Sequence, residues 1–156
     1  MAARAHNKQA GQAGQAGQAG NLVLIADDNA DIQAVLGILL RGAGFQTVTA
    51  FDGEEAVSLA AQTQPDLVLM DIVLPRLDGL AAARRIRKLA GLERVPIVGC
   101  SAYEPEDSEN AAEAERARHE YAQLNAFLRK PTDFSTLLTV MHHLLEQHPL
   151  AQTGSL

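Results

Sequence analysis

The sequence predicts an α/β fold, a doubly wound, five-stranded parallel sheet flanked by five helices. From Asn21 onward, short apolar runs alternate with longer segments whose apolar residues recur at helical spacing. The runs are rich in leucine, valine and isoleucine, which is typical of strands covered on both faces. Because a crossover between parallel strands is right-handed and covers one face of the sheet, five such units give a sheet wrapped by helices.

Five segments carry the strand pattern, namely residues 22–26, 46–50, 67–70, 95–100 and 126–129. They are short and mostly β-branched or leucine-rich, which favours buried strands. The second alternates polar and apolar residues, which indicates a position near an edge of the sheet.

Five segments carry the helical pattern, namely residues 30–41, 54–63, 79–90, 106–123 and 133–147. Gly42 and Gly44 are predicted to stop the first helix, and Asp52 and Asp133 to cap the second and the fifth. The fourth helix is rich in alanine and glutamate. The third combines an apolar stripe with basic residues expected to face mostly water, which are Arg84, Arg85, Arg87 and Lys88. The fifth has an apolar stripe formed by Leu137, Met141, Leu144 and Leu145, and this helix and the acidic region of the fourth are a candidate face for a dimer or another partner.

The chain is predicted to hold one domain between two tails. Its 156 residues suffice for one full core but not comfortably for two. Residues 1–20 end in repeats of Gln-Ala-Gly and carry too little apolar surface to offset the entropy of ordering, so we expect a flexible tail. The domain is expected over 21–148, followed by a second flexible tail over 149–156, which leaves no room for an output domain.

Composition excludes several classes of protein. The net charge of −6 argues against direct nucleic-acid binding, which needs a basic surface. The apolar runs are too short for a membrane span, and the polar N-terminus does not resemble a secretory signal. The single cysteine, Cys100, allows no internal disulfide and is expected to be a small buried residue and not a nucleophile. These features predict a cytoplasmic protein.

Charged residues follow the predicted strands at the positions where each strand ends. Asp27 and Asp28 follow the first strand, Asp71 follows the third, and Lys130 follows the fifth. In an open parallel sheet the ligand site lies at the carboxyl ends of the strands. Three crowded carboxylates need a cation, and hard oxygen ligands suit Mg²⁺, with Mn²⁺ as a second candidate. A purely structural alternative stays open for Asp27 and Asp28, which could simply cap the next helix.

With these pieces in order, residues 21–147 resemble the receiver domain of bacterial two-component response regulators, in the single-domain, chemotaxis-regulator-like form. The resemblance is carried by Asp27-Asp28 after the first strand, Asp71 to Gly79 (DIVLPRLDG), Ser101-Ala102 after the fourth strand, and Phe127 to Pro131 (FLRKP) at the fifth. It implies a flavodoxin-like receiver fold. It also implies that Asp71 is the phosphoacceptor and that Asp27, Asp28, Asp71 and the Val73 carbonyl hold the divalent ion.

The same resemblance assigns a switch. Ser101, with Ala102 beside it, would contact the new phosphoryl group, Lys130 would bind its oxygens, and the bond before Pro131 would be cis. Phe127 would be the aromatic switch residue, although an aromatic residue in a strand is also an ordinary core residue.

The function implied is a phosphoacceptor and not an enzyme in its own right: a phosphoprotein that accepts a phosphoryl group from a phosphohistidine of a sensor kinase or phosphotransfer protein and assists its own phosphorylation and dephosphorylation. It would act as a switch or as a phosphorelay intermediate. A Mg²⁺-dependent hydrolase is the first alternative, yet such enzymes place a second acid two residues after the nucleophile, where this chain has Val73. A receiver-shaped scaffold that works without phosphorylation is the second.

One stretch departs from the family pattern. The interval between Ser101 and Lys130 is longer than expected, and the excess lies in residues 104–110 and the helix after them. A Gly-Ala pair usually precedes the last strand, whereas residues 121–125 read Tyr-Ala-Gln-Leu-Asn. We therefore expect the fourth helix and its loop to be longer or reshaped.

Overall fold

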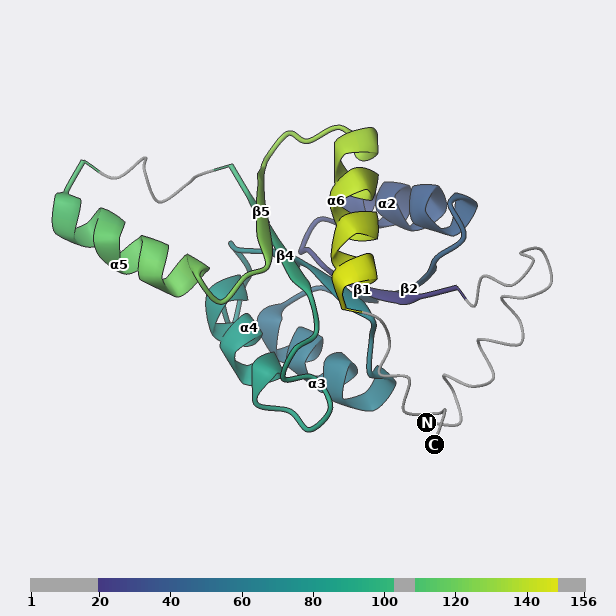
Figure 1. Ribbon diagram of the computed structural model, residues 1–156, viewed down its shortest axis with the longest axis horizontal. Helices are drawn as coiled ribbons and strands as arrows, with labels where there is room; N and C mark the ends of the chain where they lie inside the picture. Colours follow the sequence, from purple (N-terminus) through teal and green to yellow (C-terminus); the bar gives the residue numbers. More distant parts are fainter. Residues whose placement is uncertain (1–19, 103–108, 149–156) are drawn as a thin grey trace.

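The computed structural model describes residues 20–102 and 109–148 and contains one parallel sheet (Figure 1). Its strand order is β2-β1-β3-β4-β5, and every pair is parallel. The strands are β1 (Leu22–Ala26), β2 (Gln46–Ala50), β3 (Leu67–Asp71), β4 (Ile97–Ser101) and β5 (Ala126–Arg129). This confirms the predicted five-stranded doubly wound sheet, and β2 is an edge strand as its alternating pattern indicated. Both predicted tails, apart from Gly20, lie outside the described residues.

Helices cover both faces of the sheet. They are α2 (Ala30–Gly42), α3 (Gly53–Thr63), α4 (Gly79–Arg87), α5 (Ala111–Tyr121) and α6 (Phe134–Gln147). One core cluster joins α3 and α4 to one face of the sheet, and a second joins α2 and α6 to the other. Figure 1 shows these two pairs on opposite sides, with α5 extending away from the sheet at one end. Within the described ranges, no helix combines the length and the apolar character that crossing a bilayer requires.

Each helix begins at a polar cap that the sequence supplies locally. Asp52, Asp78 and Asp133 accept hydrogen bonds from the first turns of α3, α4 and α6, so the predicted caps at Asp52 and Asp133 are confirmed. Asn29 caps α2, and neither Asp27 nor Asp28 does. The capping alternative for the two acids is therefore wrong, which leaves their carboxylates for another purpose.

The fourth predicted helix is shorter than expected and is poorly buried. It begins at Ala111, where Asn110 caps it, and ends at Tyr121, and only Ala114 is buried along its length. Residues 103–108, where part of the predicted excess lies, are outside the described residues. The helix at 79–90 also stops early, at Arg87, and a turn through Gly91 follows it.

The apolar stripe on the last helix does not form a free surface. Leu137, Met141 and Leu144 are buried in the core cluster that joins α2 and α6 to the sheet, and Leu145 packs against it. This stripe therefore holds the helix to the sheet and is not available to a partner. The large apolar side chains that are exposed on a described helix lie instead on α2, at Ile32, Val35, Ile38 and Leu39.

Candidate functional site

The residues of the candidate site lie at the carboxyl ends of four strands, at one edge of the sheet. Asp27 directly follows β1, and Asp71 and Ser101 are the last residues of β3 and β4. The strand order reverses between β1 and β3, which lie side by side, and this is where open α/β sheets bind ligands. Lys130 follows β5, where its backbone N–H donates to the Ser101 carbonyl at 2.8 Å. Parallel pairing thus aligns residues that are far apart in the sequence.

Lys130 points at the acids. Its Nζ lies 3.0 Å from Asp71 Oδ2 and 3.2 Å from Asp27 Oδ2. One ammonium group therefore bridges two carboxylates from two different strands. The convergence of a distant lysine with the acids, which the sequence predicted, is present in the structure.

Three carboxylates form a candidate metal site. Asp27, Asp28 and Asp71 each offer an oxygen, and these oxygens lie within 4.8 Å of one another. Asp27 Oδ1 accepts from the Asn29 N–H at 2.8 Å, and Asp71 Oδ1 accepts from the Val73 N–H at 3.0 Å, so both side chains are held in place. Anionic oxygen ligands with open positions beside them fit Mg²⁺, and Mn²⁺ accepts the same ligand type.

Burial makes this cluster electrostatically costly. Asp27 is 5% exposed, Asp71 9% and Ser101 2%. Burial raises the pKa of Asp71, and the hydrogen bonds from Lys130 and Val73 offset only part of that effect. Burial would lower the pKa of Lys130, but the hydrogen bond and charge of Asp71, with those of Asp27, outweigh it and raise that pKa. Both pKa values are therefore raised, for different reasons. Lys130 is stabilised as a cation by two carboxylates, whereas Asp71 has only one ammonium group, which it shares with Asp27, and Asp27 repels its negative charge.

We expect the Asp71→Asn variant to be more stable than the wild type at neutral pH in the absence of metal. A carboxyl whose pKa is raised on folding binds protons more readily in the folded state, so its ionisation destabilises the fold as pH rises through the folded pKa. Asparagine removes that cost. Urea unfolding at pH 7 with EDTA measures it, and the difference should shrink as pH falls towards the unfolded pKa.

Added Mg²⁺ should reverse this order of stability. Ion binding to the folded wild type stabilises it by about 2.7 kcal/mol when the ion is at one hundred times its Kd. The Asp71→Asn variant has one anionic ligand fewer and should gain less. A variant less stable than the wild type in EDTA would contradict the electrostatic account of the site.

The predicted switch residues Ser101, Ala102 and Phe127 differ in their burial and in what they contact. Ser101 is buried beside the site, and Ala102, which follows it, is exposed. Phe127 is half-buried, and its ring packs against Tyr121 at the end of α5, with ring centroids 5.1 Å apart. Phe127 therefore contacts the last residue of α5. The Lys130–Pro131 peptide bond is cis, the geometry that the resemblance implies.

Sequence reasoning missed one buried residue that shapes the site. Gln33 on α2 is 4% exposed, and its amide donates to the carbonyls of Asp27 and Ala50, at 2.8 and 2.5 Å. It thus ties the segment after β1 to the end of β2. A lone glutamine in an amphipathic helix normally faces water, so no sequence signal set it apart.

The structure also shows the surroundings of Cys100 and Arg87. Cys100 is half-buried against the core and not fully buried as expected; the burial of its thiol raises its pKa to about 12, so it stays protonated at neutral pH, which fits the absence of a nucleophilic role. The expectation that Arg87 faces water is wrong, because it is half-buried and donates hydrogen bonds to the loops before β4 and β5.

Comparison with known proteins gives consistent matches. Residues 23–142 match the family model described as the response regulator receiver domain. The protein PilH of Pseudomonas aeruginosa is 33% identical over 123 residues, which cover 79% of this chain and 96% of that protein. The transcriptional regulatory protein PdtaR of Mycobacterium tuberculosis is 43% identical over 117 residues, 74% of this chain and 52% of that protein. The chain thus spans only about half the length of some curated relatives.

Solved structures agree with these matches. The receiver domain of the sensor histidine kinase PA1611 of Pseudomonas aeruginosa, which has a magnesium ion coordinated in its active site cleft, superimposes with a TM-score of 0.68. It is 30% identical, over 81% of this chain and 98% of that one. The receiver domain of the Francisella response regulator 1452 gives 0.69 at 26% identity, over 83% of this chain and 99% of that one. Receiver domains are signalling modules that take phosphoryl groups from histidine kinases. With its fold, its acid cluster and its lysine, the chain belongs to the response regulator receiver domain family.

Proposed function

We propose that Asp71 accepts a phosphoryl group from a phosphohistidine of a sensor kinase or phosphotransfer protein, in a Mg²⁺-dependent reaction. The chain would then act as a signalling switch or as a relay intermediate in the cytoplasm. The observation that carries this proposal is the convergence of Lys130 Nζ on Asp71 and Asp27 beside three carboxylate oxygens within 4.8 Å of one another. The functional unit is residues 21–148, and its downstream partner is a protein.

The proposed phosphoryl transfer brings two negative groups together, and Lys130 would offset their charge. An Asp71 carboxylate oxygen would attack phosphorus in line with the leaving imidazole nitrogen, so that an O–P bond forms while the P–N bond breaks and its electron pair returns to the ring. Nucleophile and phosphoryl group are both negative and repel each other. The Lys130 ammonium, already within hydrogen-bond distance of Asp71, would bind the equatorial oxygens and lower that repulsion.

The metal would be held by Asp27, Asp28 and Asp71, together with the Val73 carbonyl. A bound Mg²⁺ would neutralise charge on the transferring oxygens. The Asn29 and Val73 N–H groups pre-orient two of these carboxylates, so that little rearrangement is needed to bind the ion. Mn²⁺ would serve through the same oxygen ligands.

Phosphorylation would be read by the residues beside the site. The Ser101 hydroxyl, at the end of β4, would donate to a phosphoryl oxygen, and Ala102 would move with it. Phe127 contacts Tyr121, so any shift of this ring would pass to the last residue of α5. This gives phosphorylation a mechanical route to a helix that is poorly buried along most of its length.

The hydrolase alternative is weaker. A phosphatase with an aspartyl nucleophile needs a general acid near the leaving group. The residue two positions after Asp71 is Val73, whose side chain is 63% exposed and carries no proton to donate. A scaffold that works without phosphorylation would not need the buried, electrostatically costly Asp71.

The decisive experiment is phosphorylation by a small donor. Incubation of the full chain with phosphoramidate and Mg²⁺ should add one base-labile phosphoryl group, detected by intact mass, and EDTA should prevent it. Asp71→Asn should add none. The matched control is Asp66→Asn, which changes another buried aspartate at the opposite end of β3 and should be labelled like the wild type. An unlabelled wild type, or equal labelling of Asp71→Asn, would contradict the proposal.

A further inference from the structure

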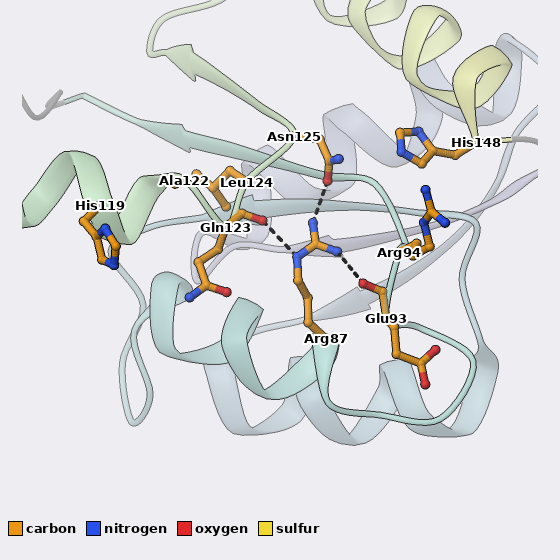
Figure 2. Close-up of a pocket in the computed structure, with 9 residues that line it drawn as sticks. All are labelled: Arg87, Glu93, Arg94, His119, Ala122, Gln123, Leu124, Asn125 and His148. Atoms are coloured by element: carbon orange, nitrogen blue, oxygen red, sulfur yellow. Dashed lines mark hydrogen bonds between the residues drawn. The ribbon is translucent and has the colours of Figure 1, made fainter.

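A polar pocket lies at the opposite end of the sheet from Asp71. It has a volume of about 530 Å³, which is within the range of small-molecule sites. Its walls come from the C-terminal ends of α4, α5 and α6 and from the segments that lead into β4 and β5 (Figure 2). Asn125, on its wall, precedes β5, whereas Lys130 follows that strand, so the two sites are roughly 15 Å apart along it.

Arg87 forms the centre of this pocket. Its guanidinium donates to the carbonyls of Gln123, Glu93 and Val95, at 2.9, 3.2 and 3.0 Å, and to Asn125 Oδ1 at 2.6 Å. All four acceptors are neutral oxygens, and within the described residues no carboxylate pairs with Arg87. Burial lowers the pKa of this guanidinium, because the charged form is partly desolvated. Four of the five guanidinium N–H groups are thus already bonded, and the pocket holds a positive charge that no carboxylate of the described residues pairs with.

Two further basic groups line the same side of the pocket. Arg94 is exposed and forms no hydrogen bond or ion pair with the part of the chain that the structure describes. In Figure 2 it extends towards His148, whose Nδ1 lies 3.0 Å from the Leu144 carbonyl. The Glu93 carboxylate, the one acid in the lining, points away from Arg87, and it accepts from the Gly91 N–H at 3.1 Å.

We propose that this pocket binds a small oxyanion of phosphate type with two or more negative charges. Arg94 and Arg87 would supply the charge, and the one N–H that Arg87 has left, together with the Asn125 amide N–H, would supply further hydrogen bonds. The fork that can bind two phosphate oxygens at once is that of Arg94, and a guanidinium binds such oxygens more strongly than neutral donors do. In a chain of net charge −6, a basic site of this kind is the place to which an anion is attracted.

Such a ligand would contact three elements of the fold at once. The pocket contacts α4 through Arg87, the end of α6 through His148, and the turn between α5 and β5 through Gln123 and Asn125. That turn lies between Tyr121 and Phe127, the ring pair between α5 and β5. A bound anion would therefore restrict the same helix that phosphorylation is proposed to move, and the two events would be thermodynamically linked.

The test is a titration of the full-length chain with pyrophosphate, followed by amide and side-chain NMR signals. Metal is removed with EDTA, and ionic strength is held constant with NaCl. We expect saturable shifts at the amides of Gln123, Leu124 and Asn125 and at Arg87 Nε–H. Arg94→Gln should weaken binding about tenfold or more, since it removes one charged donor and no contact that holds the described fold.

The matched control is Arg41→Gln, which removes the same charge at the exposed end of α2 and should change the affinity by less than about twofold. Equal weakening by both variants would mean non-specific attraction and would overturn the proposal. Shifts confined to the amides of Asp71, Val73 and Lys130 would also overturn it, because the anion would then occupy the phosphoryl site. Because the titration contains no phosphodonor, its outcome does not depend on phosphorylation of Asp71.

Discussion

Replacing Lys130 with methionine is expected to slow phosphorylation of Asp71 by about 100-fold or more while tightening the binding of Mg²⁺. The loss of rate follows from geometry. Lys130 Nζ lies 3.0 Å from Asp71, and removal of one well-placed donor to a developing oxyanion typically costs a factor of 10² to 10³. Methionine keeps most of the length of the side chain, so packing around β5 should change little.

The opposite effect on metal affinity comes from the same contacts. Lys130 binds Asp71 and Asp27, which are two of the three proposed metal ligands, and its positive charge repels a second cation nearby. Without the ammonium the three carboxylates repel one another, and a divalent ion relieves that repulsion. Isothermal titration calorimetry measures the affinity, and the mass of the protein over time measures phosphorylation.

The control for this pair of measurements is Lys88→Met, which makes the same substitution at an exposed lysine after α4. It should leave both quantities close to those of the wild type. Phosphorylation of Lys130→Met at the wild-type rate would remove the lysine from the reaction. Weaker Mg²⁺ binding by this variant would show that the lysine organises the carboxylates and does not compete with the ion.

The sheet and the candidate site could be predicted because their signals are local. Each buried strand is a run of apolar residues, and each charged residue of the site stands directly after such a run, as Asp71 stands after Met70. Parallel pairing then converts sequence position into spatial position without further information. The caps at Asp52 and Asp133 were equally local, since a cap bonds only to its own first turn.

The features that could not be predicted depend on tertiary contacts. Arg87 looked like part of a solvated basic face, but its partners lie in two loops that precede β4 and β5. Gln33 is buried because two carbonyls from other segments meet its amide. The stripe at Leu137 and Met141 looked available to a partner because the sequence does not show that α2 and α6 share one face of the sheet. In each case a distant segment decides what covers the side chain.

Replacing Gly79 with alanine is expected to destabilise the fold by about 2–4 kcal/mol and to impair the site at once. Gly79 is the first residue of α4, and its N–H donates to the Ile72 carbonyl at 2.8 Å. A Cβ at this position would lie 2.1 Å from the Asp71 carbonyl oxygen and 2.8 Å from Ile72 Cα. Both atoms belong to the backbone, so neither can rotate away as a side chain would.

Relief of that contact has to move either α4 or the end of β3, and β3 carries the proposed phosphoacceptor. Gly42→Ala is the matched control, because a Cβ there meets no atom within 4 Å, and alanine at this helix end should change stability by less than about 1 kcal/mol, in the stabilising direction. Urea unfolding measures both variants, and calorimetry measures the Mg²⁺ affinity of Gly79→Ala, which we expect to fall. A Gly79→Ala variant as stable as Gly42→Ala would mean that α4 can withdraw from β3 at little cost. In that case the position of Asp71 would depend on the sheet alone and not on the helix packed behind it.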